Sequence, residues 1–405
     1  MPRFETAAVM RKLMARYYLK AKLARYTFRK VAWITSGGPV EPLIAMGVIP
    51  IYPENHGAMI GAKKMGRELA EVAEAEGYSA DLCSYFRVDL GQAITHRSPV
   101  GGIPLLAEPG LPEPDFLLCC NNICGTVLKW YEVQARRFGV PLLFLDTPFN
   151  YDGAPEHLVD YVSTQFREMI PALEAVVGRR WRESRFLETA RLASEAIGLW
   201  GRVLDTCLNR PAPMSCFDAF FFLAPIVTLR GTREVVTFYE ALLQELEEKV
   251  ARGEGAVREE RFRLLWDNIP VWYRVRRLSE TLARHGACLV GDTYTSAWAS
   301  SEIDPTRPYE SMARSYATVF LNRNLESKVE NLCRMVERYQ ADGFIMHSNR
   351  SCKPYSLGQL DIKEEVTRRT GVPGLVIEAD MTDPRSYSDE QIETRIEAFI
   401  ETLTA

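Results

Sequence analysis

The chain has 405 residues, of which 47% are hydrophobic and 10% aromatic, so it can bury more than one hydrophobic core. Its 49 basic and 53 acidic residues give a formal net charge of -4, which argues against nucleic acid as a partner. Nine cysteines, an odd set without a secretory signal pattern, argue against a disulfide framework. The longest apolar run, residues 217–229, is too short for a membrane span and is interpreted as a buried helix or an interface. A cytoplasmic location is the default expectation.

Basic and apolar residues alternate at helical spacing in residues 1–29. The pattern predicts a basic amphipathic helix that docks on the rest of the chain or on a partner subunit. A transit peptide or a membrane-surface helix shows a similar pattern, although transit peptides are also rich in serine. We therefore expect an N-terminal helix that packs against protein.

Short apolar runs alternate with amphipathic stretches in residues 30–155, which is typical of a parallel sheet with crossover helices. This segment is the predicted first α/β domain. Its expected strands cover residues 31–36, 48–53, 115–120 and 141–146, and its clearest helices cover residues 65–77 and 126–138.

Residues 156–280 change character, because their longest amphipathic stretches all have helical periodicity. They form the predicted helical domain, with helices expected at residues 157–181, 183–208 and 232–252. Residues 281–405 form the predicted second α/β domain. Its expected strands cover residues 287–292, 343–348 and 374–380, and its helices cover residues 323–340, 361–370 and 388–403.

The two α/β segments resemble each other. RRFGVP at 136–141 and RRTGVP at 368–373 each precede an apolar strand and follow a cysteine-containing polar loop and a helix. We interpret the pair as a diverged repeat. The expected fold is two Rossmann-like, flavodoxin-like domains with parallel sheets. Functional loops of such sheets lie outside the carboxyl ends of the strands, so the loops with Cys124 and Cys352 can meet in a cleft.

Cys83 lies in a third polar, loop-like segment and completes a set of three candidate metal ligands with Cys124 and Cys352. Their wide separation excludes a zinc ribbon or a ferredoxin repeat, whose ligands cluster in sequence. Three thiolates can instead bind three corners of one iron-sulfur cluster. Cys120 is a possible spare ligand, and free cysteines are also common as small buried hydrophobic residues. Four of the other cysteines fit core positions, namely 207, 216, 288 and 333.

Five segments carry a resemblance to a known family. They are SGGPVEPLIAMGVIPIYPE (36–54), CNNICGTVLKWYE (120–132), LDTPFN (145–150), GDTYTSAW (291–298) and HSNRSCKPYS (347–356). As a set they resemble the 2-hydroxyacyl-CoA dehydratase and benzoyl-CoA reductase family, whose paired subunits each carry a [4Fe-4S] cluster. The resemblance implies that Cys83, Cys124 and Cys352 are the three cluster ligands here.

The resemblance also implies partners. Family members act on acyl-CoA with a homologous cluster-bearing second subunit and an ATP-hydrolysing iron-sulfur activator, with ferredoxin as the upstream donor. The chain itself has no Walker-type phosphate-binding loop. Segments 39–56 and 121–132 look most like benzoyl-CoA reductase, so the expected reaction is single-electron reduction of an aromatic ring to a cyclic dienoyl-CoA. The alternatives are radical dehydration of a 2-hydroxyacyl-CoA through a ketyl intermediate and a non-catalytic electron-relay subunit.

Ser36, Glu54 and His347 are the candidate catalytic residues, because all three lie at expected strand ends. A carboxyl group at Glu54 can act as a proton donor if burial raises its pKa, or it can be a helix-capping or ion-paired residue. His347 is a candidate proton donor or a structural histidine. Asn121 and Asn122 either bond to cluster sulfides or form a turn, and the turn is the simpler interpretation.

Overall fold

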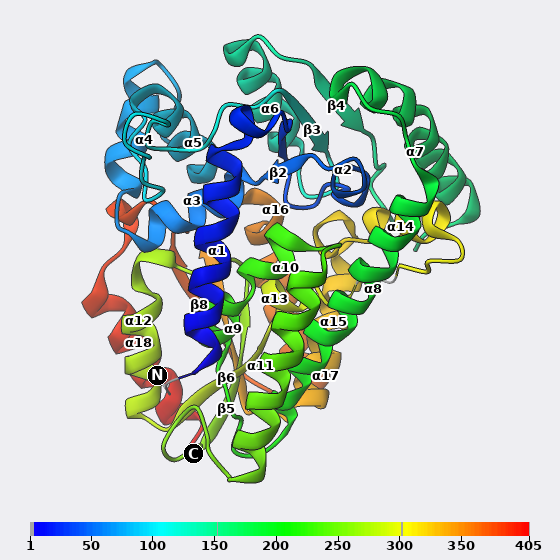
Figure 1. Ribbon diagram of the computed structural model, residues 1–405. Coiled ribbons are helices and arrows are strands. Elements are labelled where there is room, and N and C mark those ends of the chain that lie inside the picture. The colour runs from blue at the N-terminus through cyan, green and yellow to red at the C-terminus, as the bar shows by residue number, and fades with distance from the viewer. Residues whose placement is uncertain (1–3, 152, 301–302, 405) are drawn as a thin grey trace.

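Two parallel four-stranded sheets organise the chain in the computed structural model, which describes residues 4–151, 153–300 and 303–404. The first sheet has the strand order β2-β1-β3-β4, and the second has the order β6-β5-β7-β8. The two sheets lie in opposite halves of the molecule (Figure 1). The strands are β1 (Val31–Ile34), β2 (Ile49–Ile51), β3 (Phe116–Cys120), β4 (Leu142–Leu145), β5 (Phe262–Asp267), β6 (Ala287–Asp292), β7 (Gly343–Asn349) and β8 (Gly374–Ala379).

Both sheets place their strands in the same spatial order when each is numbered from its own first strand. This order, second-first-third-fourth, is that of flavodoxin-like sheets. The repeated motif also has the same role in both halves. Gly139 and Gly371 have positive φ angles of 65° and 72° and end the helices that lead into the edge strands β4 and β8. The predicted pair of related Rossmann-like domains is confirmed.

Strand β5 lies within residues 156–280, the predicted helical domain, and it pairs with both β6 and β7. The second sheet therefore begins before residue 281. Arg263 interrupts the apolar pattern of this strand, yet its side chain is only 2% exposed. Its guanidinium donates to Glu260, to the carbonyl of Cys207 and to the carbonyl of Tyr339. Because this arginine is buried and its hydrogen bonds are satisfied, a search for hydrophobic periodicity does not recognise the central strand β5.

Helices cover both sheets and fill the segment between them. In the first half they are α2 (Glu41–Ala45), α3 (Pro53–Ala62), α4 (Gly66–Ala75), α5 (Ser84–Thr95) and α6 (Gly125–Phe138). Between the sheets they are α7 (Glu156–Val177), α8 (Glu183–Asp205), α9 (Cys216–Phe222), α10 (Ala224–Leu229) and α11 (Arg233–Ala251). In the second half they are α12 (Val275–Arg284), α13 (Thr293–Ser296), α14 (Pro308–Ala317), α15 (Leu325–Tyr339), α16 (Lys353–Ser356), α17 (Gln359–Thr370) and α18 (Asp389–Thr402).

The N-terminal helix α1 (Thr6–Lys22) packs on its own chain and runs along both halves (Figure 1). At one end Thr6 bonds to Glu245 of α11, and further along the hydroxyl of Tyr17 donates to the carbonyl of Pro50 at 2.6 Å. Lys22 donates to the carbonyls of residues 108 and 110, at 2.7 Å each. The basic helix is therefore a docked element whose apolar face covers the core.

The apolar run at residues 217–229 forms most of α9 and all of α10, and most of its side chains are buried. Among the helices of the described residues, none combines the length and the apolar character that crossing a membrane requires.

The two halves meet closely where α3 and α4 lie against the chain that follows β8. A Cβ added to Gly66 would stand 2.0 Å from the carbonyl oxygen of Thr382, and one added to Gly61 would stand 3.1 Å from the Thr382 side chain. Gly66 therefore permits a backbone approach that any side chain would block, and Gly61 packs tightly against the same segment. This tight junction positions the loops that carry the candidate site.

Candidate active site

Cys83, Cys124 and Cys352 line one cavity of about 160 Å³ between the two halves. Each of them immediately precedes a helix: Cys83 precedes α5, Cys124 precedes α6 and Cys352 precedes α16. Cys124 lies in the loop after β3, and Cys352 lies in the loop after β7, the equivalent strand of the second sheet. The two loops of the repeat therefore meet, as the sequence led us to expect, and α5 adds the third cysteine.

The three thiols strongly prefer their protonated form. Burial raises the pKa of Cys83 to about 12, and burial likewise raises the pKa values of Cys124 and Cys352. Mutual repulsion adds to this effect, because ionised Cys83 and Cys124 would both raise the pKa of Cys352. The N–H groups in the first turns of α5 and α6 oppose the shift for Cys83 and Cys124. Such thiols become thiolates only beside a strongly cationic partner, and metal ions deprotonate thiols in this way.

Among the described residues, the three cysteines do not form the compact ligand group that a single metal ion needs. Across residues 4–151, 153–300 and 303–404, no three His, Cys, Asp or Glu side chains lie close enough together to hold one ion. A mononuclear site needs its ligand atoms within about 2.0–2.3 Å of one point. A cubane cluster instead offers a different iron to each thiolate, so its ligands stand further apart. Three cysteines around one cavity are therefore compatible with a cluster.

The remaining cysteines do not line this cavity. Cys119 and Cys120 end β3, are fully buried and pack into different hydrophobic cores. The sulfur of Cys120 is 3.6 Å from Oγ1 of Thr147, and neither cysteine lines the cavity. The position of Cys120 therefore does not favour a role as a further ligand. Three of the other cysteines are buried and one is half-buried, namely Cys207, Cys216, Cys288 and Cys333.

Glu54 and Ser36 also line the cavity. Glu54 accepts a hydrogen bond from the Ser36 backbone N–H at 3.0 Å and another from the Tyr131 hydroxyl at 3.2 Å. Burial raises the pKa of Glu54 to about 7, and these two hydrogen bonds oppose the shift. Its carboxyl group can therefore exchange a proton near neutral pH.

Arg230 is a cavity-lining residue that the sequence interpretation missed. Its Nε donates to Glu41 Oε1 at 2.8 Å, and its Nη2 donates to the Tyr316 hydroxyl at 2.7 Å. The Tyr316 hydroxyl in turn donates to Glu41 Oε2 at 2.6 Å. The signal available in the sequence was its place directly after the apolar run, where a charged residue is buried only with a partner.

The two asparagines after β3 join neighbouring loops. Asn121 donates to Asp146 at 2.7 Å and accepts from the Thr147 N–H, so it connects the ends of β3 and β4. Asn122 donates to the carbonyl of Gly37 at 2.9 Å. A Cβ added to Gly37 would stand 2.7 Å from Oδ1 of Asn122, which explains the glycine beside Ser36. The hydrogen bonds of these two asparagine side chains therefore connect the loop after β3 to neighbouring loops.

His347 lies at the end of β7 but does not line the cavity. Its Nδ1 is 2.6 Å from the carbonyl oxygen of Ile269, and among the described residues its Nε2 has no hydrogen-bond partner. Burial lowers its pKa, so the ring is neutral at neutral pH. Its contact with Ile269, which does line the cavity, suits a structural role, and a role in proton donation stays a prediction.

Aromatic and aliphatic side chains make up most of the wall of the cavity. They come from both halves, so the cavity exists only when the halves are docked. A mainly apolar wall with few polar groups is typical of sites for small organic ligands. The aromatic residues are Tyr85, Trp130, Tyr294, Trp298, Tyr316, Phe320 and Tyr355.

The family described as 2-hydroxyglutaryl-CoA dehydratase, D-component, matches residues 35–403. The chain belongs to this family. The resemblance to 2-hydroxyacyl-CoA dehydratases and benzoyl-CoA reductases is thereby confirmed.

Individual relatives cover nearly the whole chain. The (R)-2-hydroxyisocaproyl-CoA dehydratase alpha subunit of Clostridioides difficile is 36% identical, over 98% of this chain and 96% of the relative. The lactoyl-CoA dehydratase alpha subunit of Anaerotignum propionicum is 34% identical, over 95% of this chain and 93% of the relative. A benzoyl-CoA reductase subunit of Thauera aromatica is 29% identical, over 92% of this chain and 88% of the relative. These family members are enzyme subunits, and the two dehydratases are more similar to this chain than the reductase is.

Proposed function

We propose that this chain is the cluster-binding, substrate-binding subunit of a 2-hydroxyacyl-CoA dehydratase. The observation that carries the proposal is the meeting of Cys83, Cys124, Cys352 and Glu54 around one aromatic cavity. Identities of 36% and 34% to dehydratase alpha subunits favour dehydration. Ring reduction is supported by the lower identity of 29% to a benzoyl-CoA reductase subunit. The expectation of a reductase thus yields to its alternative as the leading proposal.

In this proposal Cys83, Cys124 and Cys352 hold a [4Fe-4S] cluster, which when bound supplies single electrons at low potential to the acyl thioester. The aromatic walls hold the acyl group and exclude water. Glu54, protonated near neutral pH, gives its proton to the departing 2-hydroxyl group, which leaves as water. The resulting carboxylate then takes the proton lost from C3. The electron returns, so the reaction is redox-neutral overall.

The names of the relatives describe them as subunits, which implies multi-subunit enzymes. We infer that this chain also works with a homologous second subunit. An ATP-hydrolysing iron-sulfur activator, supplied by ferredoxin, would deliver the starting electron.

Ring reduction of an aromatic acyl-CoA is the second candidate. The match to a benzoyl-CoA reductase subunit and the aromatic wall of the cavity favour it. Glu54 would then give a proton to the ring, and each turnover would consume electrons. A pure electron-relay role is less well supported, because a relay has no use for an aromatic cavity beside the thiols.

Substrate and electron stoichiometry separate these functions. The chain is prepared anaerobically with its second subunit, the activator, ATP and a reductant, and is given either a 2-hydroxyacyl-CoA or benzoyl-CoA. Many turnovers of the 2-hydroxyacyl-CoA per electron supplied support the dehydratase. Consumption of benzoyl-CoA with stoichiometric electron use, and no dehydration, would overturn it in favour of the reductase.

A further inference from the structure

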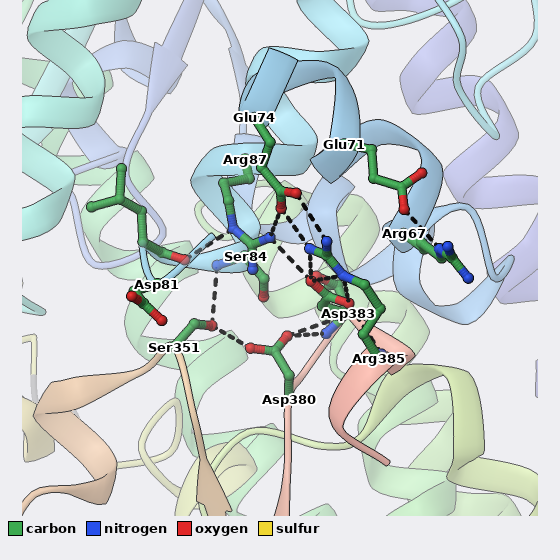
Figure 2. Close-up of polar contacts among 12 residues, drawn as sticks. Arg67, Glu71, Glu74, Asp81, Ser84, Arg87, Ser351, Asp380, Asp383 and Arg385 are labelled. Carbon is green, nitrogen blue, oxygen red and sulfur yellow. Dashed lines mark hydrogen bonds and ion pairs between the residues drawn. The ribbon is translucent and has the colours of Figure 1, made fainter. Parts of the chain in front are cut away.

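We propose that Ser351 and Asp380 form an interdomain bridge that positions Cys83 relative to Cys352. The bridge lies at the junction of the two halves, where segments distant in sequence converge (Figure 2). It rests on the proposed function, because its purpose is to set the spacing of two cluster ligands. Ser351 and Asp380 do not line the cavity with the cysteines, so they act as positioning residues.

The central contact joins the residues that are chain neighbours of the two cysteines. The backbone N–H of Ser84, which follows Cys83, donates to Oγ of Ser351 at 3.1 Å. Ser351 directly precedes Cys352. The first N–H groups of a helix have no acceptor within the helix, and Ser84 is the first residue of α5. The second half therefore supplies an acceptor that the first half lacks at this point.

Asp380 holds the Ser351 hydroxyl in the orientation that this contact needs. The hydroxyl donates to Oδ2 of Asp380 at 2.5 Å, which leaves a lone pair of Oγ directed at Ser84. The other carboxylate oxygen accepts from the N–H groups of Thr382 and Asp383, at 2.9 Å each. Asp380 is 3% exposed and directly follows β8. The two backbone hydrogen bonds hold its carboxylate in place.

Ion pairs beside the bridge hold the same two surfaces together. Arg87 of α5 is 2% exposed and pairs with Glu74 at 2.6 Å and with Asp383 at 3.0 Å. Arg385 pairs with the same two carboxylates, at 2.5 Å each. Figure 2 shows both arginines converging on these groups. Because these pairs keep the halves docked, removing the Ser351 hydroxyl loosens the start of α5 without separating the halves.

Hydrogen exchange in the cluster-free chain tests the contact itself. Ser351→Ala is expected to speed exchange of the Ser84 amide about tenfold, the value of one hydrogen bond of ordinary strength. Ser351→Thr, which keeps the hydroxyl, is expected to restore slow exchange. Ser163→Ala is the control, because Ser163 is also buried and, among the described residues, its hydroxyl bonds only to the carbonyl of Asp160 within α7. Unchanged exchange at Ser84 in Ser351→Ala would overturn the bridge.

Cluster retention tests the purpose. After anaerobic reconstitution, Ser351→Ala is expected to lose iron to a chelator several-fold faster than the wild type, Ser351→Thr and Ser163→Ala. Asp380→Ala is expected to match Ser351→Ala in both experiments. Equal iron loss in all variants would refute the positioning role even if Ser84 exchange changes. A wild type that binds no iron and sulfide would instead refute the cluster, and the exchange result would still judge the contact.

Discussion

The Tyr131 hydroxyl donates to Oε2 of Glu54 at 3.2 Å, and this hydrogen bond connects α6, the helix that begins after Cys124, to the first turn of α3. The carboxyl group of Glu54 is therefore fixed on the wall of the same cavity that the cysteines line. The position explains why burial dominates the ionisation of this carboxyl group. It also gives the first prediction a definite sign.

Glu54→Gln is expected to remove a pH-dependent loss of stability. The pKa of Glu54 is raised to about 7 in the fold, so between about pH 4.5 and 7 the folded chain keeps a proton that the unfolded chain loses. Wild-type stability therefore falls relative to the variant as the pH rises across this window, by about 3 kcal/mol in total. Urea denaturation at pH 4.5 and pH 8 measures the difference. Glu132→Gln, on the exposed side of α6, is the control.

The same variant tests the role in proton transfer. Loss of a general acid typically lowers the turnover number by about 10²- to 10⁴-fold. Glu54→Gln is expected to fall in this range while it keeps its full iron content. An unchanged turnover number would show that Glu54 serves only the structure of the loop.

Replacing any one of Cys83, Cys124 and Cys352 by alanine is expected to remove most of the bound iron and sulfide, because each thiol supplies one ligand at the shared cavity. Cys120→Ala is the matched control, since its sulfur faces Thr147 and not the cavity. Iron and sulfide analysis of anaerobically prepared protein makes the comparison. Full iron content in any of the three variants would remove that cysteine from the ligand set.

Breaking the buried Glu41–Arg230 pair is expected to destabilise the chain strongly. Glu41→Gln leaves a guanidinium whose side chain is 9% exposed without its countercharge, and such losses cost about 3–5 kcal/mol. The exposed pair Arg67–Glu71 is the control, and Glu71→Gln should cost less than about 1 kcal/mol. Denaturant unfolding compares the two variants. Similar costs for both would mean that Arg230 reaches water.

Two glycines near the cysteines are expected to respond differently to alanine. Gly37→Ala forces a Cβ to within 2.7 Å of the Asn122 side chain, and overpacking of this kind costs about 1–3 kcal/mol. Gly125→Ala, next to Cys124, meets nothing within 4 Å and should leave stability the same or higher. Thermal unfolding of both variants tests the difference. Equal stability would show that the loop with Asn122 adjusts freely.

Much of this fold could be predicted from the sequence, because apolar strands and amphipathic helices alternate with clear periodicity. Strand β5 is the exception, because its residues lack a clear apolar periodicity. Arg263 looks like a surface residue until its partners are known, and two of them, Cys207 and Tyr339, lie on other segments. Periodicity records the average environment of a residue type, whereas tertiary contacts decide each individual case.

The candidate site divides in the same way. The repeat indicated that Cys124 and Cys352 can meet, because each lies outside the carboxyl end of the equivalent strand of its own sheet. Arg230 and the bridge at Ser351 were not predictable, since each depends on contacts between segments that are about 190 or more residues apart. His347 lies at a strand end, as expected, but a strand end does not determine into which space a side chain points.

The cavity is lined by residues of both halves, and this arrangement sets the order in which the molecule assembles. Cys83 and Cys124 belong to the first half and Cys352 to the second, so neither half supplies all three thiols. Contacts this distant in sequence form late in folding, because a long loop must close first. A prosthetic group that needs all three can therefore enter only after both halves have folded and docked. Once bound, such a group would stabilise the docked arrangement of the two halves against separation.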